Sequence, residues 1–189
     1  LFLNNSVVCA YNIDFDMGFI NHQLRRMGRL PLELPTVDVL SMARDLLKLL
    51  RYNLEATAKS FDIDCSQGLH RASNDALIAY KIFLKLIDIL KEKGVEKLDE
   101  IVSLYGLNNE ISRSKEDRKI TLFKKAVDDG EILGIRYFSS ANAIEEEEVL
   151  PLRVFQEGRY YYLLCQRGNE GSSRIKLNRI FSVKTAKSS

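Results

Sequence analysis

The spacing of apolar residues changes near residue 118, and this change constrains the fold more than any other feature of the chain. Before it, apolar residues recur at helical spacing, most clearly at Ile78, Ile82, Leu86 and Leu90. After it, five short runs alternate apolar and polar residues and are separated by turn signals such as Glu157-Gly158. A chain of 189 residues can hold two small domains. We therefore predict an α/β region followed by a small β region.

The first region begins with an apolar run over residues 7–10, which predicts a short buried strand. Cap and stop residues then divide the region into helices. The expected helices are one capped by Asp14 and ending near Gly28, one over residues 38–50, a shorter one capped by Asn53, and a long one starting at Ser73 or Asn74 and ending at Gly94.

Two polar runs stand where regular elements are expected to begin, and each ends in a carboxylate. The first run ends in Asp16, and the second places His70 five positions before Asp75. Hard divalent cations take oxygen ligands, and a neutral imidazole can accept a proton from an attacking water. The same residues have a structural interpretation, in which the aspartates stabilise the positive ends of helices and His70 is a loop residue bonded to backbone.

The two runs resemble the second and third motifs of the DnaQ-like, DEDD-type 3′–5′ exonucleases. The second motif, roughly His-Asn-x-x-Phe-Asp, is matched by Asn12, Phe15 and Asp16. The third, His-x-x-x-x-Asp-Ala, is matched by His70 and Asp75 with the alanine that follows. Between them, Val37-Asp38-Val39-Leu40 is similar to the family's Asp-Thr-Leu stretch.

This resemblance implies an α/β RNase H-like exonuclease fold over residues 1–105, of the DEDDh type. It assigns Asp16 and Asp75 to a two-metal site for Mg²⁺ or Mn²⁺, and His70 to the activation of water. It places Asn12 and Phe15 at the substrate, with most of the Phe15 ring in the core. The implied substrate is nucleic acid, with DNA favoured over RNA.

The chain departs from the family pattern in two places. Tyr11 stands where the family usually has histidine. No Asp-x-Glu on an apolar strand precedes Asp16, although the family's first motif supplies two metal-binding carboxylates from such a strand. We therefore expect a partial fold whose first strands are missing, taken from a longer protein, and inactive by itself.

Residues 106–118 are polar without an apolar period and predict a linker.

The region that follows, residues 119–187, resembles a WYL domain, a small all-β barrel of the Sm or SH3 type. The run Tyr161-Tyr162-Leu163 takes the place of Trp-Tyr-Leu, and the segment Lys176-Leu177-Asn178-Arg179-Ile180 fits the family's framework.

The resemblance to WYL domains implies a nucleic-acid ligand or a nucleotide-like effector. Residues 149–189 carry eight basic and two acidic side chains, hence a net charge of +6, which suits an anionic partner. The alternative to an anion-binding site is a basic surface that is only solvated. Guanidinium groups pair bidentately with phosphate, and an exposed tyrosine can stack on a base. The candidate ligand residues are Arg136, Arg153, Arg174, Arg179 and Tyr161.

The three cysteines are odd in number and scattered in apolar contexts, which predicts reduced core thiols and a cytoplasmic location. No apolar run approaches the ~20 residues that are needed to span a bilayer, so no membrane span is expected. The function predicted from the sequence is that of a metal-dependent 3′–5′ exonuclease whose C-terminal WYL domain senses nucleic acid or a ligand. The alternative is a non-catalytic regulator or scaffold with a degenerate exonuclease fold.

Overall fold

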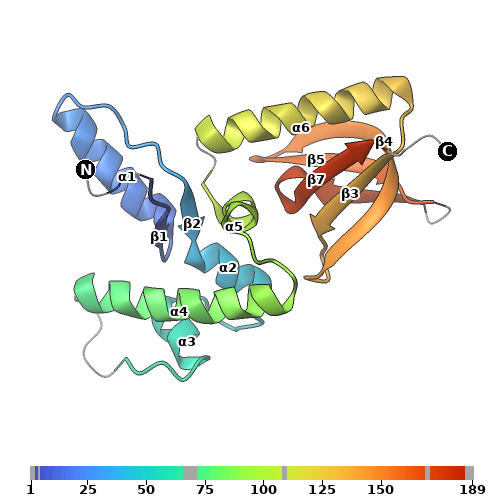
Figure 1. Ribbon diagram of the computed structural model, residues 1–189. Coiled ribbons are helices and arrows are strands. Elements are labelled where there is room, and N and C mark those ends of the chain that lie inside the picture. Colours follow the sequence, from blue (N-terminus) through green and yellow to red (C-terminus); the bar gives the residue numbers. More distant parts are fainter. Residues whose placement is uncertain (1–2, 4, 66–71, 108–109, 169–170, 186–189) are drawn as a thin grey trace. The chain divides into compact units, whose positions relative to one another are not determined.

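The computed structural model describes residues 3, 5–65, 72–107, 110–168 and 171–185, and for residues 110–113 it describes the backbone alone (Figure 1). The chain divides into two compact units, Leu1–Ile111 and Ser112–Ser189.

The N-terminal unit is built on two short parallel strands, β1 (Val8–Ala10) and β2 (Thr36–Asp38), which pair Val8 with Thr36 and Ala10 with Asp38. Helix α1 (Ile13–Arg26) and an extended segment connect them (Figure 1). Parallel strands need a crossover connection of this kind, so the pairing fits a βαβ unit.

Four further helices complete this unit: α2 (Val39–Leu46), α3 (Leu54–Lys59), α4 (Ala72–Glu92) and α5 (Leu98–Tyr105). Helix α4 packs against α2, α3 and β1. Its residues at helical spacing, Ile78, Ile82, Leu86 and Leu90, are buried as predicted. The long helix therefore supplies one continuous apolar stripe to the core of the unit.

Two of the predicted helix boundaries are wrong. Asp14 is not the cap of α1, because the helix begins at Ile13 with Asn12 in the capping position, and Asp14 lies in the first turn. The helix predicted over residues 38–50 ends at Leu46. The hydroxyl of Tyr52 donates to the Leu47 carbonyl (2.8 Å) and accepts from the backbone N–H of Leu49 (3.2 Å), so it bonds backbone groups that a continuing helix would use.

The predicted cap of α3 is confirmed. The side-chain oxygen of Asn53 accepts a 2.7 Å hydrogen bond from the backbone N–H of Ala56, which satisfies one of the helix's unpaired donors. Local signals of this kind act within one turn and can be read from the sequence alone.

The second unit holds helix α6 (Glu110–Asp129) from Ser112 onward and one antiparallel sheet with the strand order β6-β5-β4-β3-β7 (Figure 1). The strands are β3 (Leu133–Phe138), β4 (Ile144–Glu157), β5 (Tyr160–Gln166), β6 (Ser172–Lys176) and β7 (Ile180–Thr185), with a short 3₁₀ turn η1 (Leu177–Arg179) before β7. All five predicted strands are present. The pairings between described residues do not join β6 to β7, so closure into a barrel stays a prediction.

Helix α6 begins earlier than expected, and residues 110–118 of the predicted linker are helical. These residues include glutamate, lysine, aspartate and arginine, which are compatible with a solvated helix even without an apolar stripe. The stripe starts later, where Phe123 and Ala126 enter the core of the sheet. Packing of that last part supports the whole helix.

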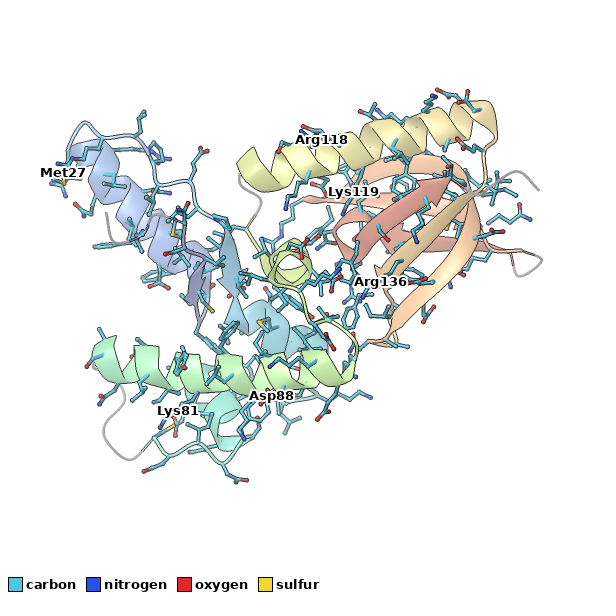
Figure 2. All side chains as sticks on the ribbon, in the orientation of Figure 1. Met27, Lys81, Asp88, Arg118, Lys119 and Arg136 are labelled. Carbon is cyan, nitrogen blue, oxygen red and sulfur yellow. The ribbon has the colours of Figure 1, made fainter. Side chains whose placement is uncertain are left out.

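Lys119 joins α6 to the sheet. Its ammonium group donates to the backbone carbonyls of Leu177 (3.1 Å) and Ile180, on either side of the turn into β7. Figure 2 labels Lys119 on the helix beside Arg118, which is exposed. Burial lowers the pKa of Lys119 to about 8.

Among the described residues, no helix is both long and apolar enough to cross a membrane.

Candidate functional sites

The carboxylate of Asp38, at the end of β2, holds the starts of two helices. One oxygen accepts from the backbone N–H groups of Asn12 (3.0 Å) and Ile13 (3.3 Å), where α1 begins. The same oxygen accepts from the N–H group of Leu40 (3.3 Å), and the second oxygen accepts from the Ser41 N–H group (3.2 Å) and hydroxyl (2.6 Å), so the carboxylate also caps α2. Helix N-termini carry unpaired N–H groups and partial positive charge, so a shared carboxylate stabilises both.

The second-motif residues lie at this capped start of α1. Asn12 adopts the left-handed conformation (φ 69°, ψ 57°), which asparagine tolerates better than most residues, and its side chain makes no capping bond. Asp16 is exposed in the first turn and makes no hydrogen bond or ion pair with another described residue. Phe15 is 72% exposed, so the expectation that its ring is mostly in the core is wrong. The Asp38 cap thus presents Asp16 and Phe15 to solvent.

Of the third-motif residues, Asp75 lies half-buried in the first turn of α4, and His70 lies outside the described residues. Helices α1 and α4 both pack against β1. The two motif aspartates therefore occupy the opening turns of two helices that contact the same short strand.

Tyr11, which stands in the usual histidine position of the second motif, serves as an anchor. Its hydroxyl donates to the carbonyl of Tyr52 (3.0 Å) and shares a 2.7 Å hydrogen bond with the Thr57 hydroxyl. Burial raises the pKa of the Tyr11 phenol. A histidine has no hydroxyl group that could make both contacts. Through these two bonds Tyr11 ties the corner between β1 and α1 to helix α3 and the residue before it.

The donor chemistry of Asp16 and Asp75 suits a hard divalent cation, because both offer carboxylate oxygens. Their number does not complete a site. Within the described ranges, no group of three or more histidine, cysteine, aspartate or glutamate side chains could hold a metal ion. The described residues supply part of a donor set and do not by themselves form a metal centre.

In the second unit, the four candidate arginines occupy different environments. Arg153 and Arg174 lie on one face of β4–β6, stacked on Phe155 (5.9 Å) and Tyr162 (4.6 Å). Arg179 donates to the carbonyls of Phe138 (3.3 Å) and Ser139 (2.7 Å), and these bonds tie it to the end of β3. Of the four candidates, Arg153 and Arg174 lie on a common surface.

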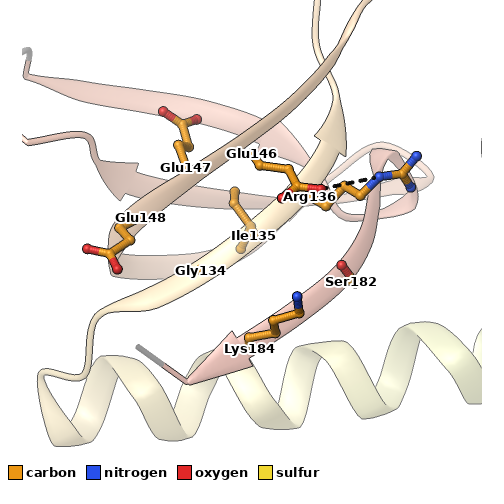
Figure 3. Close-up of a pocket in the computed structure, with 8 residues that line it drawn as sticks. All are labelled: Gly134, Ile135, Arg136, Glu146, Glu147, Glu148, Ser182 and Lys184. Carbon is orange, nitrogen blue, oxygen red and sulfur yellow. Dashed lines mark ion pairs between the residues drawn. The ribbon is translucent and has the colours of Figure 1, made fainter. Parts of the chain in front are cut away.

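The fourth arginine, Arg136, lines a hollow of about 410 Å³ on the outer side of β3, β4 and β7 (Figure 3). Gly134 forms part of its floor, and Lys184 and three consecutive glutamates, Glu146 to Glu148, also line it. Arg136 is 3.6 Å from the Glu146 carboxylate and stacks on Phe181 (5.4 Å). The hollow therefore offers an anion no net positive charge, because three carboxylates face two cations.

Tyr161 faces the interior. Its ring is partly buried against the core cluster that contains Leu163 and Cys165, on the same side of β5. Successive side chains of a strand point to opposite faces, so Tyr160 and Tyr162 lie on the other side. On that other side Tyr162 is itself buried, so Tyr160 is the partly exposed ring that this strand offers for stacking.

A polar cluster orders one end of the sheet. The Tyr137 hydroxyl donates to the Glu145 carboxylate at 2.6 Å, while Arg167 stacks on the Tyr137 ring (5.4 Å) and lies 3.1 Å from Glu147. Burial and then the glutamate hydrogen bonds raise the pKa of Tyr137, so it stays a neutral donor. Nothing in the sequence pattern marks this cluster, because its members come from three strands or turns.

Comparison with known families finds a match for each of the two regions. Residues 1–83 match the family model described as Exonuclease (RNase_T), and residues 118–185 match the WYL domain model. The chain thus joins a region that matches the exonuclease family model to a region that matches the WYL domain model. The order of the two resemblances predicted from the sequence is confirmed.

The exonuclease region is similar to bacterial replication proteins. It is 33% identical over 103 residues to the PolC-type DNA polymerase III of Thermotoga petrophila, a match covering 54% of this chain and 8% of that protein. It is 28% identical over 127 residues to the DNA polymerase III subunit epsilon of Rickettsia conorii, covering 64% of this chain and 55% of that one. The chain thus spans from under a tenth to about half of these relatives. Asp16, Asp38 and Asp75 all fall within the family match.

The region that matches the WYL domain model contains all the candidate arginines and Tyr161. Among solved structures, the proteasome accessory factor B/C (PafBC) of Arthrobacter aurescens aligns over 71% of this chain and 20% of that one, with a TM-score of 0.37 and 19% identity.

Proposed function

We propose that the exonuclease region takes part in metal-dependent 3′–5′ hydrolysis of terminal phosphodiesters in nucleic acid, with DNA favoured over RNA. The observation that carries this proposal is the position of the two motif aspartates. Asp16 and Asp75 open two helices that pack against the same strand, within a region that matches the exonuclease family. Carboxylates at such rigid positions can be held toward a common ligand.

Each motif residue has a stated role in the proposal. Asp16 and Asp75 contribute oxygen ligands to Mg²⁺ or Mn²⁺, which when bound supplies charge stabilisation for the entering and leaving oxygens. His70 accepts the proton of the attacking water. Asn12 and the exposed ring of Phe15 contact the terminal nucleotide. Asp38 holds the start of α1, so Asp16 and Phe15 keep their positions without rearrangement during the reaction.

The test is release of 3′-labelled nucleotide from single-stranded DNA in the presence of Mn²⁺. It uses the natural protein, meaning the longer protein that the sequence analysis expects. Asp16→Asn and Asp75→Asn should each lower turnover sharply, because each amide weakens a metal ligand. Asp14→Asn is the matched control, since Asp14 is an exposed aspartate in the same helical turn. Full turnover by Asp16→Asn would refute the site. DNA binding without any turnover in the parent protein would favour the non-catalytic regulator.

We further propose that the WYL domain, as a small closed barrel, binds nucleic acid or a nucleotide-like effector in a cytoplasmic protein. Its support is the +6 charge of residues 149–189 and the cations that stack on aromatic rings. Binding of a fluorescent single-stranded oligonucleotide to the whole chain should weaken steeply with salt, because each phosphate contact releases condensed counterions. Competition by free nucleotides distinguishes an effector site from a strand-binding site. No binding of either ligand at low salt would refute this proposal.

A further inference from the structure

One face of the sheet carries a row of rings with cations over them. Phe155, Tyr162 and Lys176 are cross-strand neighbours on β4, β5 and β6. The Phe155 and Tyr162 rings are stacked, with centroids 5.5 Å apart and planes inclined by 18°. We call Arg153, Phe155, Tyr160, Tyr162, Arg174 and Lys176 the cation–aromatic face.

This face lies on the opposite side of the strands from the core. Val154, Leu163 and Ile175 belong to the core or pack against it, one on each of the three strands. Because side chains alternate along a strand, the neighbours of these residues point away from the core. Helix α6 enters the core side through Phe123. The cation–aromatic face is therefore the outer surface of β4–β6.

Each cation on the face is positioned by a ring. Arg174 lies over Tyr162 at 4.6 Å, Lys176 over Tyr160 at 4.3 Å, and Arg153 over Phe155 at 5.9 Å. A guanidinium held flat on a ring keeps its edge N–H groups available for phosphate and has less rotamer freedom to lose on binding.

The charge of the face is almost entirely positive. Its neighbouring carboxylate, Glu157, pairs with Arg174 at 2.5 Å. Neither Arg153 nor Lys176 makes an ion pair with a described carboxylate. The hollow around Arg136 differs, because three glutamates line it. An anionic chain would thus meet attraction on β4–β6 and repulsion at the hollow.

We propose that the cation–aromatic face is the binding surface for single-stranded nucleic acid, an inference that rests on the nucleic-acid function proposed above. Arg153, Arg174 and Lys176 contact the phosphates. Phe155 and Tyr160, which are partly exposed, stack with unpaired bases. A duplex can satisfy only the cations, because its bases are already stacked. Combined basic and aromatic groups of this kind suit single strands of any sequence.

The test measures binding of a fluorescent twelve-nucleotide oligothymidine, and of a duplex of equal length, to the whole chain as a function of salt. The double variant Arg153→Gln/Lys176→Gln should weaken single-strand binding and reduce the magnitude of the salt slope by about 1.4, that is, by about 0.7 for each lost contact. Phe155→Leu should weaken it roughly 5- to 140-fold, with little effect on the duplex. Arg118→Gln, an exposed arginine on α6, is the matched control.

The outcomes separate this inference from the broader proposal. If Arg136→Gln weakens binding while the double variant and Phe155→Leu do not, the domain binds nucleic acid elsewhere and the face is wrong. Equal losses for single strand and duplex in Phe155→Leu would overturn the stacking role. If the parent chain binds neither probe at low salt, both proposals fail. Circular dichroism of each variant checks that the sheet is intact, and the surface double variant keeps the test decisive if Phe155→Leu does not fold.

Discussion

The two units place their candidate functional residues by different means. In the exonuclease region, Asp16 and Asp75 stand at helix starts, and one carboxylate, Asp38, fixes the start of α1 through hydrogen bonds to backbone. In the WYL domain, the candidate residues lie along strands, and cross-strand register brings Phe155 beside Tyr162. The first arrangement depends on a few groups that each make several bonds. The second is spread over many weak contacts, so single substitutions should have smaller effects there.

The largest effect is expected in the chemistry of the first unit. His70→Ala in the natural protein should lower turnover about 10²–10⁴-fold, because the attacking water loses its general base. Release of 3′-labelled nucleotide over a range of pH measures this. A near-full rate across pH would make His70 a structural loop residue.

The next effect tests the shared cap. Asp38→Ala should destabilise the exonuclease region by about 1–4 kcal/mol, since two helix N-termini each lose a cap worth about 0.5–2 kcal/mol. Urea unfolding with peptide-resolved hydrogen exchange locates the loss. Asn53→Ala is the matched control, because Asn53 caps α3 alone and should cost about 1 kcal/mol. Equal losses for the two variants would contradict the double role of Asp38.

A comparable anchor in the WYL domain is Lys119. Lys119→Ala should destabilise that domain by about 1–3 kcal/mol, because the buried carbonyls of Leu177 and Ile180 lose their donor. Hydrogen exchange should rise in β7 and leave α4 unchanged. Arg118→Ala, on the solvent side of the same helix, serves as the control and should alter exchange in neither element.

The smallest effect concerns the ion pair on the cation–aromatic face. Glu157→Gln should change stability by less than about 1 kcal/mol, because exposed ion pairs contribute little. It should nevertheless strengthen oligothymidine binding at low salt, since Arg174 then lacks its competing carboxylate. Weaker binding in this variant would show that Glu157 holds Arg174 in its binding position.

Much of the secondary structure could be predicted because its signals are local. The alternating runs gave all five strands, and the apolar stripe of α4 gave its buried face. The start of α6 was missed because residues 110–118 lack an apolar period. The sequence pattern marks Asp14 as the cap of α1 because only nearby residues can be weighed. The carboxylate that accepts from the N–H groups at the start of α1 belongs to Asp38, which is 26 residues away from Asn12 in sequence.

The sequence by itself determined the resemblance to two families and their order, and it singled out Asp16 and Asp75 as candidates, because motif spacing and hydrophobic period are properties of the chain. Only the tertiary structure decided which side chains share a surface. Alternation requires Tyr161 and Tyr162 to face opposite ways, but packing of the core decides that Tyr161 points inward. Likewise, sequence cannot separate Arg174 on the outer face from Arg179 at the backbone, since that choice depends on the register of β5 with β6 and on the turn before β7.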